Sequence, residues 1–246
     1  MIRPQLVYRK DVFCSGLRCA GYEVHNLNPF DPTPDDVLLI WNRYGQFDEQ
    51  AKWFEKKGAT VLVAENGYLR EGLDGRWFAL AKGHHAGAGA WRAGGPERWD
   101  ALGIKLAPWS QKGKEVLILA QRGIGEPGVA SPKNWAQTIQ QKYGGRIRPH
   151  PGDAPPKVSL RDDLRDVACV ITWHSAAALY ALMYGVPVFH AFPQWIGARA
   201  ALRLDQYPRA LRDDAARLEM FRELIWAQWS LEEIANGTAF RHLLRL

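Results

Sequence analysis

The sequence of 246 residues lacks several features that would assign it to a particular class of protein. No run of about 18 uninterrupted apolar residues is present, as a transmembrane helix would need, and the first ten residues, MIRPQLVYRK, lack the apolar stretch of a secretory signal. There are only three cysteines, Cys14, Cys19 and Cys169, and no Cys-x-x-Cys clip. We therefore expect a soluble cytoplasmic protein without structural disulfides or a thiolate zinc site.

Two common catalytic motifs are also missing. No Gly-Lys-Ser/Thr follows the glycine-rich turn LILAQRGIGEPG, which disfavours ATP hydrolysis. No Asp-x-Asp pair follows a strand, so nothing in the sequence predicts Mg²⁺ or Mn²⁺ held against a diphosphate. The chain has neither an internal repeat nor a low-complexity tract. We expect no metal and no resident cofactor.

The positive charge lies in the middle of the chain. Between Asn66 and His150 there are thirteen Lys or Arg against six Asp or Glu, a net +7, whereas the whole chain carries +6. Such an asymmetry suits a polyanionic partner or a phosphorylated substrate, and it also occurs on surfaces charged only for solubility.

Apolar runs and amphipathic segments alternate along the chain, which predicts α/β layers built on parallel sheets. The expected strands are residues 35–42, 59–65, 114–121, 146–150, 168–173 and 186–192, and the expected helices are 46–58, 131–145 with Ser131 as N-cap, and 175–185. Residues 67–108 are expected to be rich in loops, and the chain from Ile196 onward mostly helical. We predict two Rossmann-like halves, 1–110 and 111–246, joined near residues 107–114.

Polar residues follow three of these strands. In ITWHSAAALYALMYGVPVF, His174 and Ser175 stand between a strand and a helix, which predicts Ser175 as N-cap of an anion-binding turn. His150 and Pro151 follow a second strand. Arg122 and Gly123 open the glycine-rich turn after a third, where an arginine could grip phosphate in a bidentate manner. We expect the three strand ends to converge on one crevice, although capping and turn formation alone would also explain these residue types.

Three short segments resemble a known family. RPHP with His150, HSAAALYALMYGVPVF with Ser175, and AENGYLR with Glu65 and Asn66 are similar to the HP, serine and acidic-acidic-Gly motifs of bacterial GT-B glycosyltransferases of the capsule-polysaccharide, Kdo-transferase and sialyltransferase type. Residues 94–109 and 225–237 resemble phage and prophage proteins with the same segments. The resemblance implies a glycosyltransferase whose first half binds the acceptor, and the missing Asp-x-Asp pair predicts that it is metal-independent. Its second half would bind a nucleotide sugar through His150 and Ser175.

The acidic motif departs from the family pattern at one position. Asn66 stands where the family usually has the carboxylate that acts as general base, and an amide cannot accept a proton. Glu65 is our first candidate for this role. His84, His85 and Asp74 are the alternatives, as is retaining chemistry without such a base.

The acceptor is predicted from the basic segment. Trp77, Trp91, Trp99 and Trp109 are interleaved with its cations, which is typical of nucleic-acid binding. Together with the phage resemblance, this favours hydroxymethylated pyrimidines in DNA as acceptor, in the host cytoplasm if the chain is phage-encoded. The alternatives are a capsule-type or lipopolysaccharide-type glycan, or a binding module without catalysis. No obligate protein partner is expected.

Overall fold

The computed structural model describes residues 7–25, 31–69, 73, 76–85, 87–110, 113–125, 128–154 and 157–244. The chain divides into two compact units. Unit 1 comprises Met1–His85, Gly89–Arg98 and Ile225–Leu246, and unit 2 comprises Ala86–Ala88 and Trp99–Leu224. Each unit contains one sheet with helices packed against it, which is the α/β architecture with two Rossmann-like halves predicted from the sequence.

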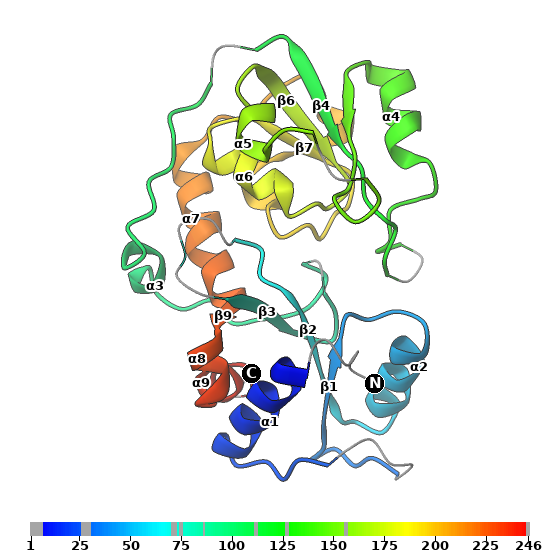
Figure 1. Cartoon of the computed structure of the whole chain (residues 1–246), viewed down its shortest axis with the longest axis vertical. Coiled ribbons are helices and arrows are strands. Elements are labelled where there is room, and N and C mark those ends of the chain that lie inside the picture. Colours follow the sequence, from blue (N-terminus) through cyan, green and yellow to red (C-terminus); the bar gives the residue numbers. More distant parts are fainter. Residues whose placement is uncertain are drawn as a thin grey trace. The chain divides into compact units, whose positions relative to one another are not determined.

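The sheet of unit 1 has the order β1-β2-β3-β9. Its strands are β1 (Val37–Trp41), β2 (Thr60–Asn66), β3 (Trp77–Lys82) and β9 (Gln228–Ser230). The β1 and β2 strands are parallel, whereas β3 is antiparallel to both β2 and β9. Helix α2 (Gln46–Lys56) covers one face through Ala51 and Phe54. Figure 1 shows α1 (Val7–Cys19), α8 (Leu231–Ala235) and α9 (Thr238–Leu244) on the other face.

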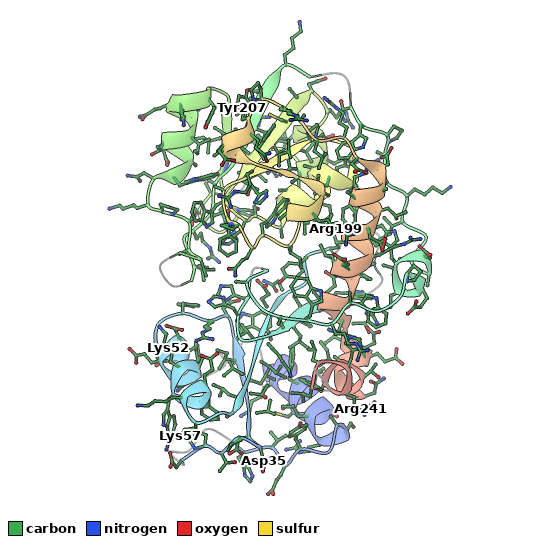
Figure 2. The ribbon with its side chains drawn as sticks, turned by 180° about the vertical axis from the view of Figure 1, so that it is seen from behind. Asp35, Lys52, Lys57, Arg199, Tyr207 and Arg241 are labelled. Carbon is green, nitrogen blue, oxygen red and sulfur yellow. The ribbon has the colours of Figure 1, made fainter. Side chains whose placement is uncertain are left out.

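Aromatic rings hold the helices of the second face to the sheet. Phe13 of α1 packs edge to face on Phe78 of β3 and on Phe240 of α9, with ring centroids 5.8 and 6.3 Å apart. Arg241, labelled in Figure 2, donates from Nη1 to the carbonyl oxygen of Cys19 at 2.9 Å and so ties α9 to the end of α1. The last segment of the chain is therefore part of the core of unit 1.

This arrangement differs from the predicted halves in two places. Residues 225–246 were expected in the second half, but β9 pairs with β3 and α8 and α9 bury their apolar faces in unit 1. The change from unit 1 to unit 2 falls at Arg98 rather than near residues 107–114. Arg98 belongs to unit 1 because its guanidinium binds Glu233 and lies 4.4 Å from the ring centroid of Trp229.

The sheet of unit 2 has the order β5-β4-β6-β7-β8 and all its strands are parallel. These strands are β4 (Glu115–Leu119), β5 (Arg146–Arg148), β6 (Val167–Thr172), β7 (Val188–His190) and β8 (Leu202–Arg203). Its helices are α4 (Trp135–Tyr143), α5 (Leu160–Asp163), α6 (Ala177–Met183), α7 (Asp214–Leu224) and the 3₁₀ turns Ala198–Ala200 and Leu204–Gln206. Helix α3 (Glu97–Asp100) spans the boundary between the units, and the 3₁₀ turn Ile225–Ala227 belongs to unit 1. Within the described ranges, no helix is long and apolar enough to cross a membrane.

Helix α4 begins later than the sequence predicts. Ser131 was expected as its N-cap, but the N-cap is Asn134, whose φ of 56° is left-handed. Residues 131–134 form a turn in which the Trp135 N–H donates to the Pro132 carbonyl. Asn tolerates this backbone conformation better than most residues, which is why the helix starts after it.

Candidate functional site

In unit 2 the carboxyl ends of the parallel strands meet at one edge of the sheet. The last paired residues of four strands are Leu119, Arg148, Thr172 and His190. Gln121, His150 and His174 each stand two residues beyond this row on β4, β5 and β6. The shared register therefore brings these residues to one edge, which is where ligands bind in open α/β sheets.

His150 and Arg122 lie beside each other at this edge. The half-buried His150 ring accepts a hydrogen bond at Nδ1 from the N–H of Gly152, at 2.9 Å. A Cβ added to Gly152 would lie 3.1 Å from both His150 Nδ1 and Arg122 Nη1, so the glycine leaves room for the two side chains. Burial, followed by the positive charge of Arg122, lowers the pKa of His150. Two of the predicted site residues are thus brought together, with Pro151 in the exposed turn next to them.

The turn after β4 presents Arg122 to solvent. Gly123 and Gly125 have φ values of 64° and 129°, which only glycine adopts easily, so the turn depends on them. Arg122 is exposed, and no carboxylate within the described part of the chain forms an ion pair with it. A guanidinium in this state can bind an anion.

Gln121 joins the end of β4 to the turn after β6. Its Oε1 accepts from the backbone N–H of His174 at 2.8 Å, and its Nε2 lies 2.9 Å from His174 Nδ1. The sequence reasoning did not single out Gln121, because one glutamine matches no motif. Its position next to Arg122, at the end of a strand, was the only signal available.

Ser175 does not cap α6 in the predicted way. The N-cap residue is Ala176, and the helix spans only Ala177–Met183. The Ser175 hydroxyl accepts from the N–H of Ala177 at 3.2 Å, while the Ser175 N–H donates to the Thr172 hydroxyl at 2.8 Å. The tight turn after β6 displaces the helix start by one residue, and the serine still satisfies an N–H of the first turn.

The remaining predicted residues lie in unit 1. Glu65, in β2, is half-buried and its Oε1 accepts from the Tyr68 hydroxyl at 2.5 Å, whereas Asn66 is exposed. The Gly67 N–H bonds the Trp77 carbonyl, so the turn after β2 is tied to β3. These contacts also fit a role for Glu65 as an anchor of the loop after β2. Asp74, an alternative base, is outside the described residues.

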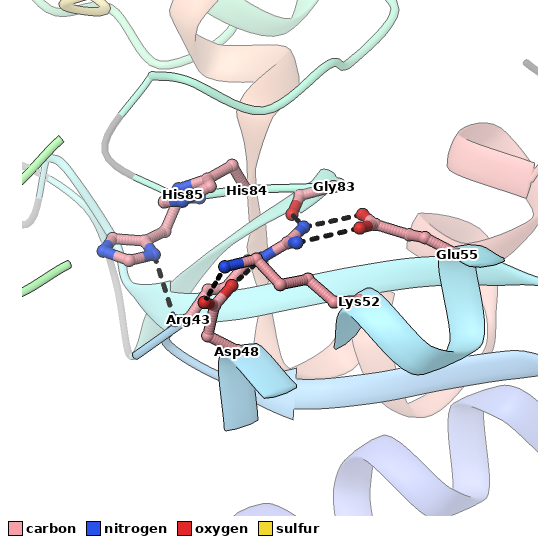
Figure 3. Close-up of polar contacts among 7 residues, drawn as sticks. All are labelled: Arg43, Asp48, Lys52, Glu55, Gly83, His84 and His85. Atoms are coloured by element: carbon pink, nitrogen blue, oxygen red, sulfur yellow. Dashed lines mark hydrogen bonds and ion pairs between the residues drawn. The ribbon is translucent and has the colours of Figure 1, made fainter. Parts of the chain in front are cut away.

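His84 and His85 are buried rather than on a flexible surface loop. They are 8% and 4% exposed, and their rings stack with centroids 4.7 Å apart. The N–H of His85 donates to His84 Nδ1 at 2.9 Å, and the N–H of Arg43 donates to His85 Nδ1 at 3.1 Å. Backbone amides therefore fix both rings, and Figure 3 shows the contact between His85 and Arg43.

Arg43 anchors this pair and was not predicted. Its buried guanidinium binds both carboxylate oxygens of Glu55, at 2.6 and 2.8 Å, and donates from Nε to Asp48 at 2.9 Å (Figure 3). The hydrogen bond with Glu55 is the main cause that raises the pKa of Arg43. Burial would raise the pKa of Asp48, but hydrogen bonds from Lys52 and Arg43 outweigh it and lower that pKa.

Within the described residues, no group of three or more His, Cys, Asp or Glu is arranged to hold a metal ion.

No protein-family model and no curated protein sequence matches the chain. Solved structures with a similar fold include two from one organism. One is KpsC, beta Kdo 2,7 transferase, from Thermosulfurimonas dismutans, with 16% identity, a TM-score of 0.50, and coverage of 83% of this chain and 84% of that one. The other is KpsC, beta Kdo 2,4 transferase, from the same organism, with 15% identity, a TM-score of 0.50, and coverage of 78% and 80%. At these identities the similarity establishes the GT-B-like fold.

Proposed function

We propose that the chain is a glycosyltransferase that moves a sugar from a nucleotide sugar to a hydroxyl group of a capsule-type glycan. One observation carries the proposal. At the carboxyl edge of the unit 2 sheet, Arg122 and His150 form a pair of hydrogen-bond donors on a fold similar to that of two Kdo transferases.

The tautomer of the neutral His150 ring favours the binding of phosphate. Since Nδ1 accepts from the Gly152 N–H, the hydrogen of the neutral ring is on Nε2. Nε2–H and the guanidinium can only donate, and the oxygens of a deprotonated phosphate can only accept. The pair therefore suits the phosphate of a nucleotide sugar, which becomes the leaving group.

Transfer breaks the bond between the anomeric carbon and the phosphate oxygen and forms a bond from that carbon to the acceptor oxygen. The nucleotide leaves with the electron pair, and the acceptor hydroxyl loses a proton. We assign the proton to Glu65. The lone pairs of His84 and His85 at Nδ1 are already used by backbone N–H groups, so in their neutral form these rings are donors at Nε2.

The DNA acceptor is less well supported. Several cations of the basic segment are occupied, since Arg98 pairs with Glu233 and both Arg146 and Arg148 pair with Asp163. Trp99, one of the four tryptophans expected to stack on bases, is 3% exposed. A glycan acceptor needs neither a continuous basic face nor these rings.

The proposal is tested by calorimetric titration with a panel of nucleotide sugars, beginning with nucleotide-activated Kdo because both similar structures are Kdo transferases. We expect binding that persists in EDTA. His150→Ala and Arg122→Ala should each weaken it roughly 10- to 100-fold, the usual effect of losing a hydrogen bond to a charged group. Lys133→Ala removes an exposed charge of the same unit and should leave affinity unchanged. Equal affinities in all three variants would refute the assignment.

Catalysis is tested separately by turnover. Glu65→Gln should keep nucleotide affinity and lower the transfer rate by about 10² to 10⁴, the usual contribution of a general base. A normal rate would leave Glu65 as a loop anchor. Nucleotide binding without transfer to any glycan or to hydroxymethylated DNA would instead indicate a binding module.

A further inference from the structure

The side chain of Gln121 uses both of its polar atoms on one residue. A backbone N–H can only donate, so the atom that faces the His174 N–H at 2.8 Å must be the amide oxygen. The atom that faces His174 Nδ1 at 2.9 Å is then the NH₂ group, which can only donate. His174 Nδ1 is therefore the acceptor and carries no hydrogen.

This contact determines the tautomer of His174. With Nδ1 as acceptor, the neutral ring has its hydrogen on Nε2 and is a donor there. His150 is held in the same tautomer by the Gly152 N–H. His150 and His174, which follow β5 and β6 at the carboxyl edge of the unit 2 sheet, are thus both donors at Nε2, each because a neighbouring group occupies Nδ1.

We propose that Gln121 is a positioning residue for the nucleotide site, because it holds the turn that carries Ser175 and keeps the His174 ring protonated at Nε2. The inference rests on the proposed function. Gln121 directly precedes Arg122, so one side chain fixes the end of the strand that leads to Arg122 against the turn that leads to Ser175. Loss of the Gln121 contacts would disturb both Arg122 and the turn that carries Ser175, although Gln121 itself is not proposed to touch the nucleotide.

Two variants separate the roles of the amide oxygen and the NH₂ group. Gln121→Glu keeps an acceptor for the His174 N–H but cannot donate to Nδ1, so its carboxylate draws the hydrogen to Nδ1. Gln121→Met has a similar length and loses both contacts. Gln140→Met is the matched control, because Gln140 also makes a side-chain hydrogen bond in unit 2, to the Gly145 carbonyl at 2.9 Å, away from this edge.

The first measurement is the ¹⁵N NMR spectrum of the histidine side chains in the free protein, with His174 assigned by the signals lost in His174→Gln. We expect the Nε2–H pattern for wild type and the control, and an Nδ1–H or doubly protonated pattern for Gln121→Glu. A role in stability alone would leave this pattern unchanged. An Nδ1–H pattern in wild type would overturn the proposal whether or not a nucleotide binds.

The second measurement is the affinity for the nucleotide sugar that wild type binds. We expect about tenfold weaker binding in Gln121→Glu and at least that in Gln121→Met, with the control unchanged. Wild-type affinity in both Gln121 variants would overturn the proposal while leaving the proposed function intact. Failure of wild type to bind any nucleotide in the panel would overturn the proposed function and, with it, the role of Gln121 in the site.

Discussion

Replacing Arg43 with methionine should destabilise unit 1 by about 3 kcal/mol. The substitution keeps most of the apolar stem and removes a guanidinium that binds two carboxylates and the Gly83 carbonyl. Breaking a buried ion pair by removing one partner usually costs about 3–5 kcal/mol. The lower end applies here, because the Glu55 side chain is 39% exposed and can be hydrated, and Lys52 Nζ remains 2.6 Å from Asp48.

Urea unfolding measures this cost, with amide hydrogen exchange in β1 and α2 assigning the transition to unit 1. Lys52→Met is the control, since Lys52 joins the same network but its side chain is 59% exposed, and it should cost no more than about 1 kcal/mol. The triple variant Arg43→Met, Asp48→Asn, Glu55→Gln should recover part of the loss because no charge is left unpaired. A cost for Arg43→Met no larger than that for Lys52→Met would refute the reasoning.

The same network predicts an acid dependence. Because the pKa of Asp48 is lowered in the folded chain, its carboxylate stabilises the fold above its ordinary pKa, and this contribution is lost as the pH falls through the lowered value. Arg43→Met removes one of the groups that lower this pKa. The stability difference between wild type and Arg43→Met should therefore shrink below about pH 4, and a constant difference would contradict this account.

Three further outcomes are expected in unit 2. Burial lowers the pKa of His150, with a further contribution from Arg122, and burial also lowers the pKa of His190. As the pH falls, the unfolded chain therefore takes up protons on these histidines before the folded chain does. The free energy of unfolding should fall below about pH 6.5, by at most about 1.4 kcal/mol per pH unit for each histidine. Urea midpoints that stay constant from pH 7.5 to 5.5 would contradict this. Gly152→Ala should leave the urea midpoint unchanged and weaken nucleotide binding, measured by calorimetry, about tenfold, because its Cβ would lie 3.1 Å from both Arg122 Nη1 and His150 Nδ1, in the side chains proposed to bind the nucleotide. Burial raises the pKa of the Cys169 thiol to about 11, so iodoacetamide at pH 8 should leave it unmodified in intact-mass measurements while the exposed Cys19 reacts.

The apolar runs predicted the parallel strands well. The segments expected at 35–42, 59–65 and 114–121 agree with β1, β2 and β4 to within one or two residues at each end. Each is a continuous run of branched or large apolar residues, which is typical of a strand buried on both faces. The parallel register then follows from the alternation with helices.

The strands that were missed depend on distant partners. Trp77–Lys82 lies in a stretch rich in glycine and was expected to be loop, yet its middle residues are buried between β2 and β9. The β9 strand has three residues and pairs with a segment about 150 residues earlier in the chain. No local pattern reveals such a pairing, and for the same reason the sequence could not show that the C-terminal helices complete unit 1.

The site residues were also easier to predict beside parallel strands than beside antiparallel ones. In unit 2 every strand runs the same way, so residues that follow the strands gather at one edge, and Arg122 and His150 lie beside each other as predicted. Gln121 was missed because two contacts with His174 across the sheet edge, rather than its residue type, distinguish it from other glutamines.

In unit 1 the candidate bases Glu65, His84 and His85 are separated, because β3 runs antiparallel to β2. Glu65 pairs with Ala79, while the chain leaves β3 at Gly83, whose N–H bonds the Val61 carbonyl. The backbone of Gly83 is thus level with a residue four positions before Glu65, about 13 Å away along the strand. His84 and His85 follow Gly83 and are fixed by the amides of His85 and Arg43. If these histidines rather than Glu65 accepted the proton, each would first have to give up a backbone hydrogen bond at Nδ1, whereas a carboxylate that accepts from the Tyr68 hydroxyl keeps further lone pairs for a second donor.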